Sequence, residues 1–195
     1  MTTSVTSAQG ISQEPYTLLF SDYGGEMKTT HRMLERVPDG KDDWRPHEKS
    51  MTLGGLASHI AQIPGYGIAI LTTDELDAAM MPRFQPDTTA ERLVKFDEES
   101  RELRRLLDAL TWDEATSRWS FKYGDRIIAE GERAKLIRTM VITHIAHHRA
   151  QLGVYLRILG VPIPGSYGPS ADEPLGWPDF AWDGKYKLRG DRGED

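Results

Sequence analysis

The sequence predicts an all-α protein, an antiparallel up-down four-helix bundle in which each helix buries one apolar face. Two observations carry this prediction. Four long segments have apolar residues at steps of three and four, which places those residues on one side of a helix. Only one short stretch, before the fourth segment, alternates apolar and polar residues as a strand does. Four amphipathic helices with short connections bury their apolar faces by packing against one another.

The first helix is expected over about residues 16–37. It should end at residues 38–40, because the Pro-Asp-Gly sequence there does not continue a helix. The apolar stripe of this helix consists of Tyr16, Phe20, Tyr23, Met27, His31 and Leu34.

The second helix is expected over about residues 52–73, with Ser50 or Thr52 as its N-cap. Pro64 lies in its middle and lacks a backbone donor, so we expect a kink there. Several glycines lower the helix propensity of this segment, which therefore depends on tertiary packing. Its apolar face consists of Thr52, Leu56, His59, Ile63, Tyr66 and Ile70.

The third helix is expected over about residues 88–110, and the many Glu and Arg on its other faces indicate a solvated surface. Residues 119–123 alternate apolar and polar side chains and predict a small hairpin. The fourth helix is expected over about residues 131–159, and it should end at Gly160 with Pro162 just beyond.

The length of 195 residues fits a single domain, which we expect over residues 14–184. Within it, the Gly/Pro-rich stretch 160–184 contains two Trp and is expected to pack on the helices. Residues 1–13 form a flexible lead-in and residues 185–195 a flexible tail on this interpretation.

The composition excludes several classes of function. Lys plus Arg number 24 and Asp plus Glu number 30, so the formal net charge is −6. This charge argues against a nucleic-acid partner and against docking on anionic membranes. The absence of Cys excludes disulfides, zinc–thiolate sites, iron–sulfur clusters and a cysteine nucleophile. With no signal peptide and no apolar run long enough to span a bilayer, the expected location is the cytoplasm.

Three histidines are the informative residues. A helical wheel places His144, His148 and Gln151 at the centre of the apolar face of the fourth helix, with Arg133 about three turns earlier. Burying such groups without partners costs about 1–3 kcal/mol each. Two His at i and i+4 direct their rings to one place, and His59 lies at the centre of the apolar face of the second helix. The basic residues of the fourth helix fall around the back of the wheel: Lys135, Arg138, Arg149 and Arg157.

Facing helices of a bundle are where metal sites are built, and three neutral imidazoles leave a fourth position open, as catalytic zinc sites do. The other interpretation is that these are hydrogen-bonded core histidines, the usual role of a lone His on an apolar face. A metalloprotease is excluded, because no His-Glu-x-x-His motif is present. His147 is interpreted as a group behind the ligands or on the surface. His31 is interpreted as a packed core histidine that could border the pocket.

The chain resembles the DinB/YfiT superfamily in three stretches. Trp-Arg-Pro at 44–46 and Leu-Ala-Ser-His-Ile-Ala at 56–61 look like the entry to the second helix of that family. His-Ile-Ala-His-His-Arg-Ala-Gln at 144–151 is similar to its His-x-x-x-His-Arg-Gly-Gln signature, with Ala150 in place of the usual Gly. Tyr-Gly-Pro-Ser-Ala-Asp-Glu at 167–173 resembles its C-terminal segment.

The resemblance implies a four-helix bundle that binds a divalent metal through His59, His144 and His148, and a homodimer. It also implies a metal-dependent enzyme acting on a small molecule, most simply a thiol-dependent transferase or isomerase with a low-molecular-weight thiol as cosubstrate. A metal-dependent hydrolase and a non-catalytic metal or small-molecule binding module are the alternatives.

Imidazole ligands suit zinc first and nickel next, and protons compete for them below a pH of about 6.5. The side chains expected to orient water or substrate beside the metal are Gln151, Tyr66 and Tyr155.

Overall fold

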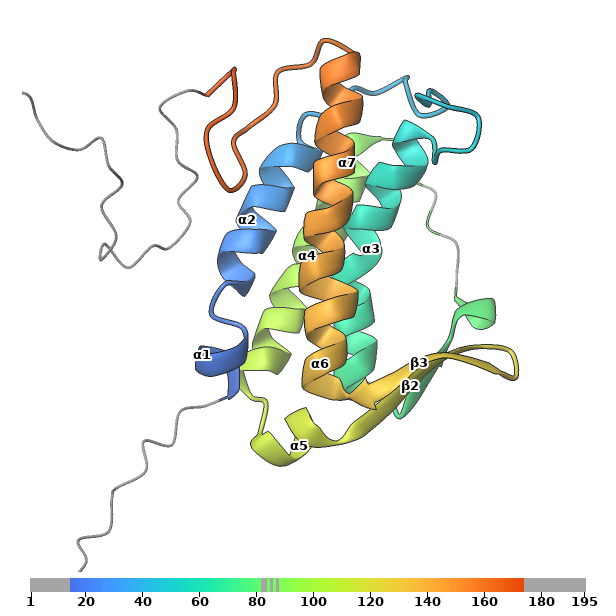
Figure 1. The fold of residues 1–195 in the computed structure, drawn as a ribbon, viewed down its shortest axis with the longest axis vertical. Coiled ribbons are helices and arrows are strands. Elements are labelled where there is room, and N and C mark those ends of the chain that lie inside the picture. The colour runs from blue at the N-terminus through green and yellow to red at the C-terminus, as the bar shows by residue number, and fades with distance from the viewer. Residues whose placement is uncertain (1–14, 82–83, 85, 87, 174–195) are drawn as a thin grey trace, which may run out of the picture.

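The computed structural model describes residues 15–81, 84, 86 and 88–173, and within them the fold is mostly helical with one small sheet (Figure 1). Four long helical stretches run alongside one another. The helical elements are α1 (Pro15–Leu19), α2 (Tyr23–Leu34), α3 (Leu53–Thr72), η1 (Ala78–Met80), α4 (Thr89–Asp108), α5 (Trp112–Thr116), α6 (Arg133–Ile137), η2 (Arg138–Thr143) and α7 (His144–Ile158).

Each of the four long helical stretches packs against two of the others. Helix α3 packs against both α4 and α7, and α2 packs against the same two helices. The core lies where these four surfaces meet. Its fully buried side chains include Leu53, Leu56, Ile60 and Ile63 of α3, Phe96, Leu103 and Leu107 of α4, and Ile145, Leu152 and Leu156 of α7. No helix in the described ranges is long and apolar enough to cross a membrane.

The predicted first helix is in fact two helices. Helix α1 ends at Leu19 and α2 begins at Tyr23. The break is stabilised from outside, because the Arg138 guanidinium donates to the Leu19 carbonyl and, at 2.6 Å, to the carboxylate of Asp22. A partner 116 positions away along the chain, which periodicity does not reveal, thus decides where the first helix is interrupted.

The predicted second and third helices are α3 and α4. The Thr52 hydroxyl accepts a hydrogen bond from the Gly55 amide and caps α3, which continues through Pro64. Thr88 and Glu91 form a capping box at the start of α4. The solvated surface expected on α4 has one exception: Arg92 is 1% exposed and pairs with Asp42 and the Ser58 hydroxyl.

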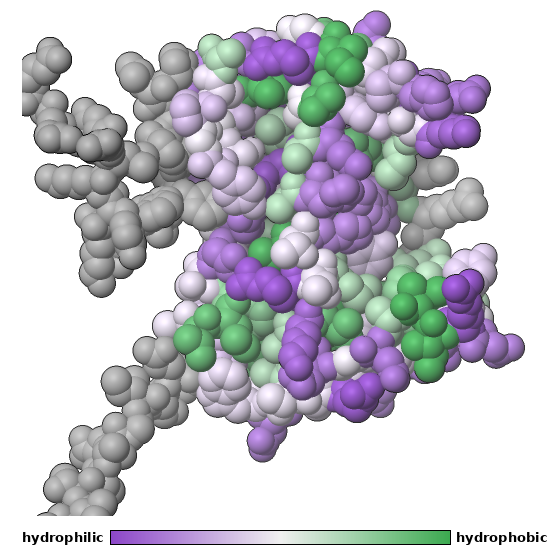
Figure 2. All heavy atoms as spheres, viewed as in Figure 1, coloured by the Kyte–Doolittle hydropathy of each residue, from purple (hydrophilic) through white to green (hydrophobic). Residues whose placement is uncertain are grey.

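The predicted hairpin is present, as part of a larger sheet. Strands β2 (Arg118–Tyr123) and β3 (Arg126–Glu132) pair antiparallel, and β1 (Glu75–Asp77) adds a parallel third strand beside β2. Strand β1 and helix α5 are too short to show a periodicity in the sequence. Figure 2 shows hydrophobic side chains gathered over the hairpin, where Ile127 and Ile128 are exposed.

The predicted fourth helix runs without a break from α6 through η2 to α7. The middle part, η2, is a π-helical stretch, and the helix starts at Arg133 because residues 131 and 132 belong to β3. Gly160 follows the last turn with φ of +74°, a conformation that favours glycine.

Residues 161–173 return from the end of α7 toward α2 (Figure 1). Glu173 binds the Arg32 guanidinium with both carboxylate oxygens at 2.7 Å, and the Tyr167 hydroxyl donates to Glu26 at 2.9 Å. The remainder of the stretch expected to pack on the helices, residues 174–184, lies outside the described residues. The same holds for the expected lead-in 1–13 and tail 185–195.

Candidate metal centre

Helices α3 and α7 bring together the three histidines that the sequence singles out. Nε2 of His144 lies 3.3 Å from Nε2 of His59 and 2.9 Å from Nε2 of His148. One ligand nitrogen from each residue lies within 4.8 Å of the other two. Two of these side chains are neighbours on one helix, but His59 is 85 positions away from His144. The packing of α3 on α7 therefore completes the cluster.

The cluster lies at the edge of the core. The helical wheel had predicted that these side chains lie at the centre of the buried face of the fourth helix. All three imidazoles are half-buried and Gln151 is exposed. The buried ridge of α7 instead runs through Ile145, Arg149, Leu152 and Leu156. The helical wheel did not predict this buried ridge, because α7 is covered by α3 on one side and by α2 on the other. As a result, the three imidazoles are accessible from one side.

The second nitrogen of two of the rings is held by hydrogen bonds. Nδ1 of His144 donates to the Met140 carbonyl at 3.2 Å, and because that oxygen only accepts, Nδ1 carries the proton. Nδ1 of His148 donates to Oε1 of Gln151 at 2.7 Å. Both Nε2 atoms are then unprotonated and face each other with their lone pairs. This is the arrangement in which protein histidines bind metals.

The spacing of the nitrogens fits a transition metal. Two nitrogens that are each about 2.0–2.1 Å from a tetrahedral zinc ion lie about 3.3 Å apart, and about 2.9 Å apart where the angle is a right angle. The two Nε2–Nε2 distances from His144 are 3.3 and 2.9 Å. Unprotonated lone pairs this close repel one another unless a cation lies between them. The donor set and its spacing thus suit a divalent ion such as zinc or nickel.

The electrostatics of the site keep the imidazoles neutral. Burial, together with the neighbouring His148 and His144, lowers the pKa of His59 from 6.5 to about 4. Burial also lowers the pKa of His144 and of His148, with the adjacent imidazoles adding to the effect. Neutral imidazole is the form that binds metals. Every charged group that acts on His59 in these shifts is another histidine.

Aromatic side chains border the cluster on the α3 side. The Tyr66 ring lies 6.4 Å from the His59 ring, and the Phe121 ring of β2 lies 6.3 Å from that of Tyr66. Burial, together with the charge of Glu99, raises the pKa of the Tyr66 hydroxyl. The sequence indicated Tyr66 but not Phe121, because only the sheet brings that strand to α3.

Tyr155 lies farther along α7. Its ring packs edge-on against Trp44 at 5.6 Å, and its hydroxyl donates to the Met51 carbonyl at 3.3 Å. These contacts fix the loop before α3 to α7. Of the three side chains expected beside the metal, the structure thus ties Gln151 to His148, puts Tyr66 next to His59, and directs Tyr155 to the entry of α3.

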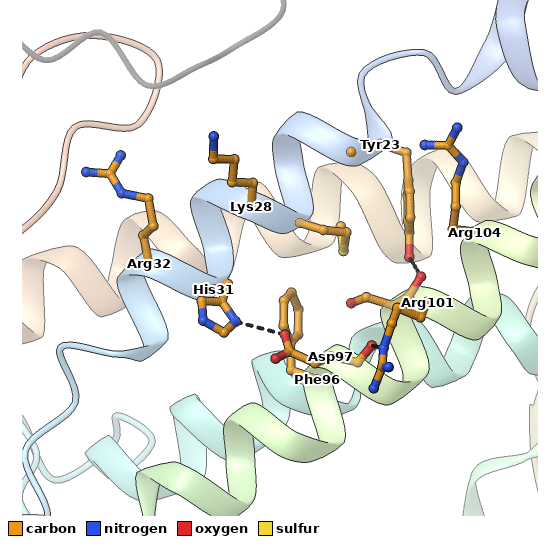
Figure 3. Close-up of a pocket in the computed structure, with 11 residues that line it drawn as sticks. Tyr23, Lys28, His31, Arg32, Phe96, Asp97, Arg101 and Arg104 are labelled. Atoms are coloured by element: carbon orange, nitrogen blue, oxygen red, sulfur yellow. Dashed lines mark hydrogen bonds and ion pairs between the residues drawn. The ribbon is translucent and has the colours of Figure 1, made fainter.

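The remaining histidines of interest lie elsewhere. The ring of His147 is 4.8 Å from that of His148, but His147 is exposed and does not join the cluster. His31 is not the packed core residue expected: its side chain is 31% exposed, and it pairs with Asp97 at 2.8 Å and Glu35 at 3.4 Å. It lines a groove between α2 and α4 that contains none of the three clustered histidines (Figure 3).

Comparison with known proteins shows which family the chain resembles. The model of the DinB family matches residues 2–179 of the chain. YrdA, an uncharacterised protein of Bacillus subtilis strain 168, is 25% identical over 157 residues, which are 80% of this chain and 87% of YrdA.

Two crystal structures share the fold. The DinB-like protein YjoA of Bacillus subtilis superposes with a TM-score of 0.56 at 17% identity, covering 73% of this chain and 94% of YjoA. A DinB-like protein of Bacillus cereus ATCC 10987 superposes with a TM-score of 0.57 at 20% identity, covering 74% of this chain and 93% of that protein.

Proposed function

The chain belongs to the DinB family, and from this premise we propose that it is a metal-dependent enzyme whose divalent ion is held by His59, His144 and His148. The observation that carries the proposal is the convergence of three imidazole nitrogens, two of them with Nδ1 anchored so that Nε2 faces the shared position. We propose zinc as the ion, with nickel as the closest substitute.

The donor set indicates the class of chemistry. A divalent ion bound by three neutral imidazoles would supply an uncompensated positive charge, which stabilises a thiol as its thiolate near neutral pH. The side chains of the chain itself have supporting roles. Gln151 holds the tautomer of His148, and the rings of Tyr66 and Phe121 offer an apolar wall to a small organic substrate.

A thiol-dependent transferase or isomerase fits this site better than a hydrolase. Activation of water is commonly assisted by a carboxylate general base beside the metal. Among the described residues, the group that could hold a metal contains histidines alone, and no carboxylate contributes to the pKa shifts of the three. A thiol brought in as cosubstrate supplies its own nucleophile. We further propose that the long helices form the up-down bundle expected from the sequence and that the enzyme works as a homodimer.

Metal binding is tested on untagged protein that is stripped with EDTA and reconstituted with zinc. Elemental analysis should find about one equivalent of zinc in the wild type and none above background in His148→Ala. The matched control is His147→Ala, which removes the next histidine on the same helix and should retain the metal. Equal zinc in His148→Ala and the wild type would overturn the site.

The thiol is tested with the cobalt-substituted protein. Glutathione added to the wild type should produce a thiolate-to-cobalt charge-transfer absorption, and His148→Ala should not show it. A screen of electrophilic small molecules then follows, with and without thiol. Turnover of an ester or amide without any thiol would favour the hydrolase, and a metal-loaded protein that neither binds thiol nor turns over substrate would favour a binding module.

A further inference from the structure

The groove between α2 and α4 has an apolar floor and basic walls (Figure 3). It has a volume of about 770 Å³, and Tyr23, Met27 and Phe96 line its floor. Lys28 and Arg32 rise from the α2 wall. Arg101 and Arg104 belong to the α4 wall, so four cations surround an apolar surface.

The acidic groups of the groove are already engaged. Asp97, the one carboxylate among the described lining residues, binds the His31 ring at 2.8 Å. Arg104 pairs with Asp108, which lies outside the lining. The Arg101 side chain donates to the Asp97 carbonyl, and within the described residues it has no carboxylate partner. The groove therefore suits an occupant that is both apolar and acidic.

The lining also leaves a hydrogen-bonding group without a partner. Ser100 is 9% exposed and contributes to the groove. Its hydroxyl has no hydrogen-bond partner within the described part of the chain. Since the hydroxyl oxygen is itself buried, a polar group in the groove reaches it only after a neighbouring side chain moves.

The described chain ends at the mouth of this groove. Glu173 binds Arg32, which lines the groove, through both carboxylate oxygens at 2.7 Å. The residues that follow, 174–184, read Pro-Leu-Gly-Trp-Pro-Asp-Phe-Ala-Trp-Asp-Gly. This segment contains three aromatic side chains and two aspartates, and it has no cation. Its composition is complementary to the groove in both charge and polarity.

Residues 174–184 are also long enough to reach along the groove. The groove extends along α2 from Arg32 to Tyr23, nine residues that span about 14 Å in a helix. Trp182 lies nine positions after Glu173, and an extended chain of that length reaches up to about 30 Å. All three aromatic residues of the segment are therefore within reach of the groove.

We propose that residues 174–184 of the same chain occupy the α2–α4 groove, with aromatic side chains on its apolar floor and Asp179 and Asp183 against its basic walls. In this arrangement the C-terminal segment clamps α2 to α4, on a different pair of helices from the histidine cluster. The proposal stands independently of the metal and of the reaction.

Cysteine cross-linking tests the placement, because the chain has no Cys of its own. Lys28→Cys on the groove is combined with Ala181→Cys in the segment. Under mild oxidation with diamide, an intramolecular disulfide should form at least tenfold faster than in the control pair Val94→Cys and Ala181→Cys. Val94 is an exposed residue of α4 that does not line the groove. Equal rates in the two pairs would overturn the proposal.

The same reaction distinguishes other occupants of the groove. A disulfide-linked dimer as the main product, with a rate that rises with protein concentration, would assign the groove to a second copy of the chain and overturn the proposal. A charge exchange tests the acidic contacts. Arg101→Asp or Asp179→Arg alone should slow the intramolecular cross-link several-fold, and the two together should restore it. A double variant as slow as the singles would contradict the proposed pairing.

Discussion

At the scale of single residues, hydrogen bonds to Nδ1 of two of the three imidazoles orient the Nε2 atoms of those rings. His144 is oriented by a backbone carbonyl of its own helix, and His148 by the side-chain amide of Gln151. Both partners belong to the same helical stretch as the histidines, so the two hydrogen bonds form as soon as that stretch is helical. They leave the Nε2 atoms free and directed to one position, which prepares the site before any metal arrives.

Gln151→Leu should therefore weaken metal binding without removing a ligand. We expect the zinc dissociation constant to rise about 10–100-fold, because the ring of His148 loses the acceptor that fixes its tautomer. Competition with a chromophoric chelator measures this constant. Gln151→Glu, which keeps an acceptor for Nδ1, is the matched control and should bind within a few-fold of the wild type. A Leu variant with unchanged affinity would show that Gln151 plays no part.

Glu99 gives the protein a pH dependence unrelated to the metal. Burial raises the pKa of its carboxyl, although the Lys95 ammonium lies 2.7 Å from Oε1. A raised folded-state pKa stabilises the protein at low pH, and this contribution is lost as the pH rises through that value. The melting temperature of Glu99→Gln should therefore rise relative to that of the wild type as the pH increases from 4 to 7. Glu98→Gln, at an exposed position of α4, controls for the lost charge. A difference in melting temperature between Glu99→Gln and the wild type that does not change with pH would contradict the raised pKa of Glu99.

At the scale of elements, the glycines of α3 permit close packing. A Cβ atom at Gly67 would overlap Cδ2 of Leu103 on α4, and one at Gly54 would overlap the side chain of Asp42. The helix accepts a low intrinsic propensity at these positions because the neighbouring elements come closer than any side chain allows. The contact at Gly67 is one of the close contacts between α4 and α3, the helix that carries His59.

Two Gly→Ala substitutions separate packing from propensity. Gly67→Ala should lower the free energy of unfolding by about 1–3 kcal/mol, because Leu103 must move. Gly153→Ala, in the interior of α7, should be neutral or stabilise by up to about 1 kcal/mol. A Cβ atom there meets Cε of Met33 at 3.5 Å, an ordinary contact. Urea unfolding measures both, and equal effects of the two substitutions would show that propensity alone matters.

At the scale of the whole molecule, one buried ion pair joins the beginning of the fold to its end. Arg149 of α7 was expected on the solvent side of its helix, but it is 1% exposed. It donates to the Glu26 carboxylate at 2.7 Å and to the Thr30 hydroxyl at 3.0 Å. The Tyr167 hydroxyl donates to the other oxygen of Glu26. This group of side chains links α2, α7 and the returning C-terminal stretch.

Breaking the pair should be more damaging than removing it. Glu26→Leu alone should lower the free energy of unfolding by about 3–5 kcal/mol, since it leaves the Arg149 charge buried without its carboxylate. Adding Arg149→Met should recover part of that loss. Asp108→Asn, which breaks the half-exposed pair with Arg104, should change stability by less than about 1 kcal/mol. Denaturant midpoints at constant m-value measure these effects, and additive losses in the double variant would contradict the coupling.

The sequence by itself predicted the four long helical stretches, a cap at Ser50 or Thr52, the hairpin and the three histidines of the site. These features follow from spacing along one segment, and the geometry of a helix or strand converts spacing into a shared face. The i, i+4 relation of His144 and His148 needed nothing else. The identity of His59 as the third member was predictable because it too lay among apolar residues.

Only the tertiary structure decided which surfaces meet. It placed the histidines at the edge of the core, broke the first helix where Arg138 binds, added β1 to the hairpin, and buried Arg92 and Arg149 against Asp42 and Glu26. The physical reason is that each of these features depends on a partner dozens of positions away. Periodicity records what a segment does with its own neighbours, and it carries no information on which distant segment will face it.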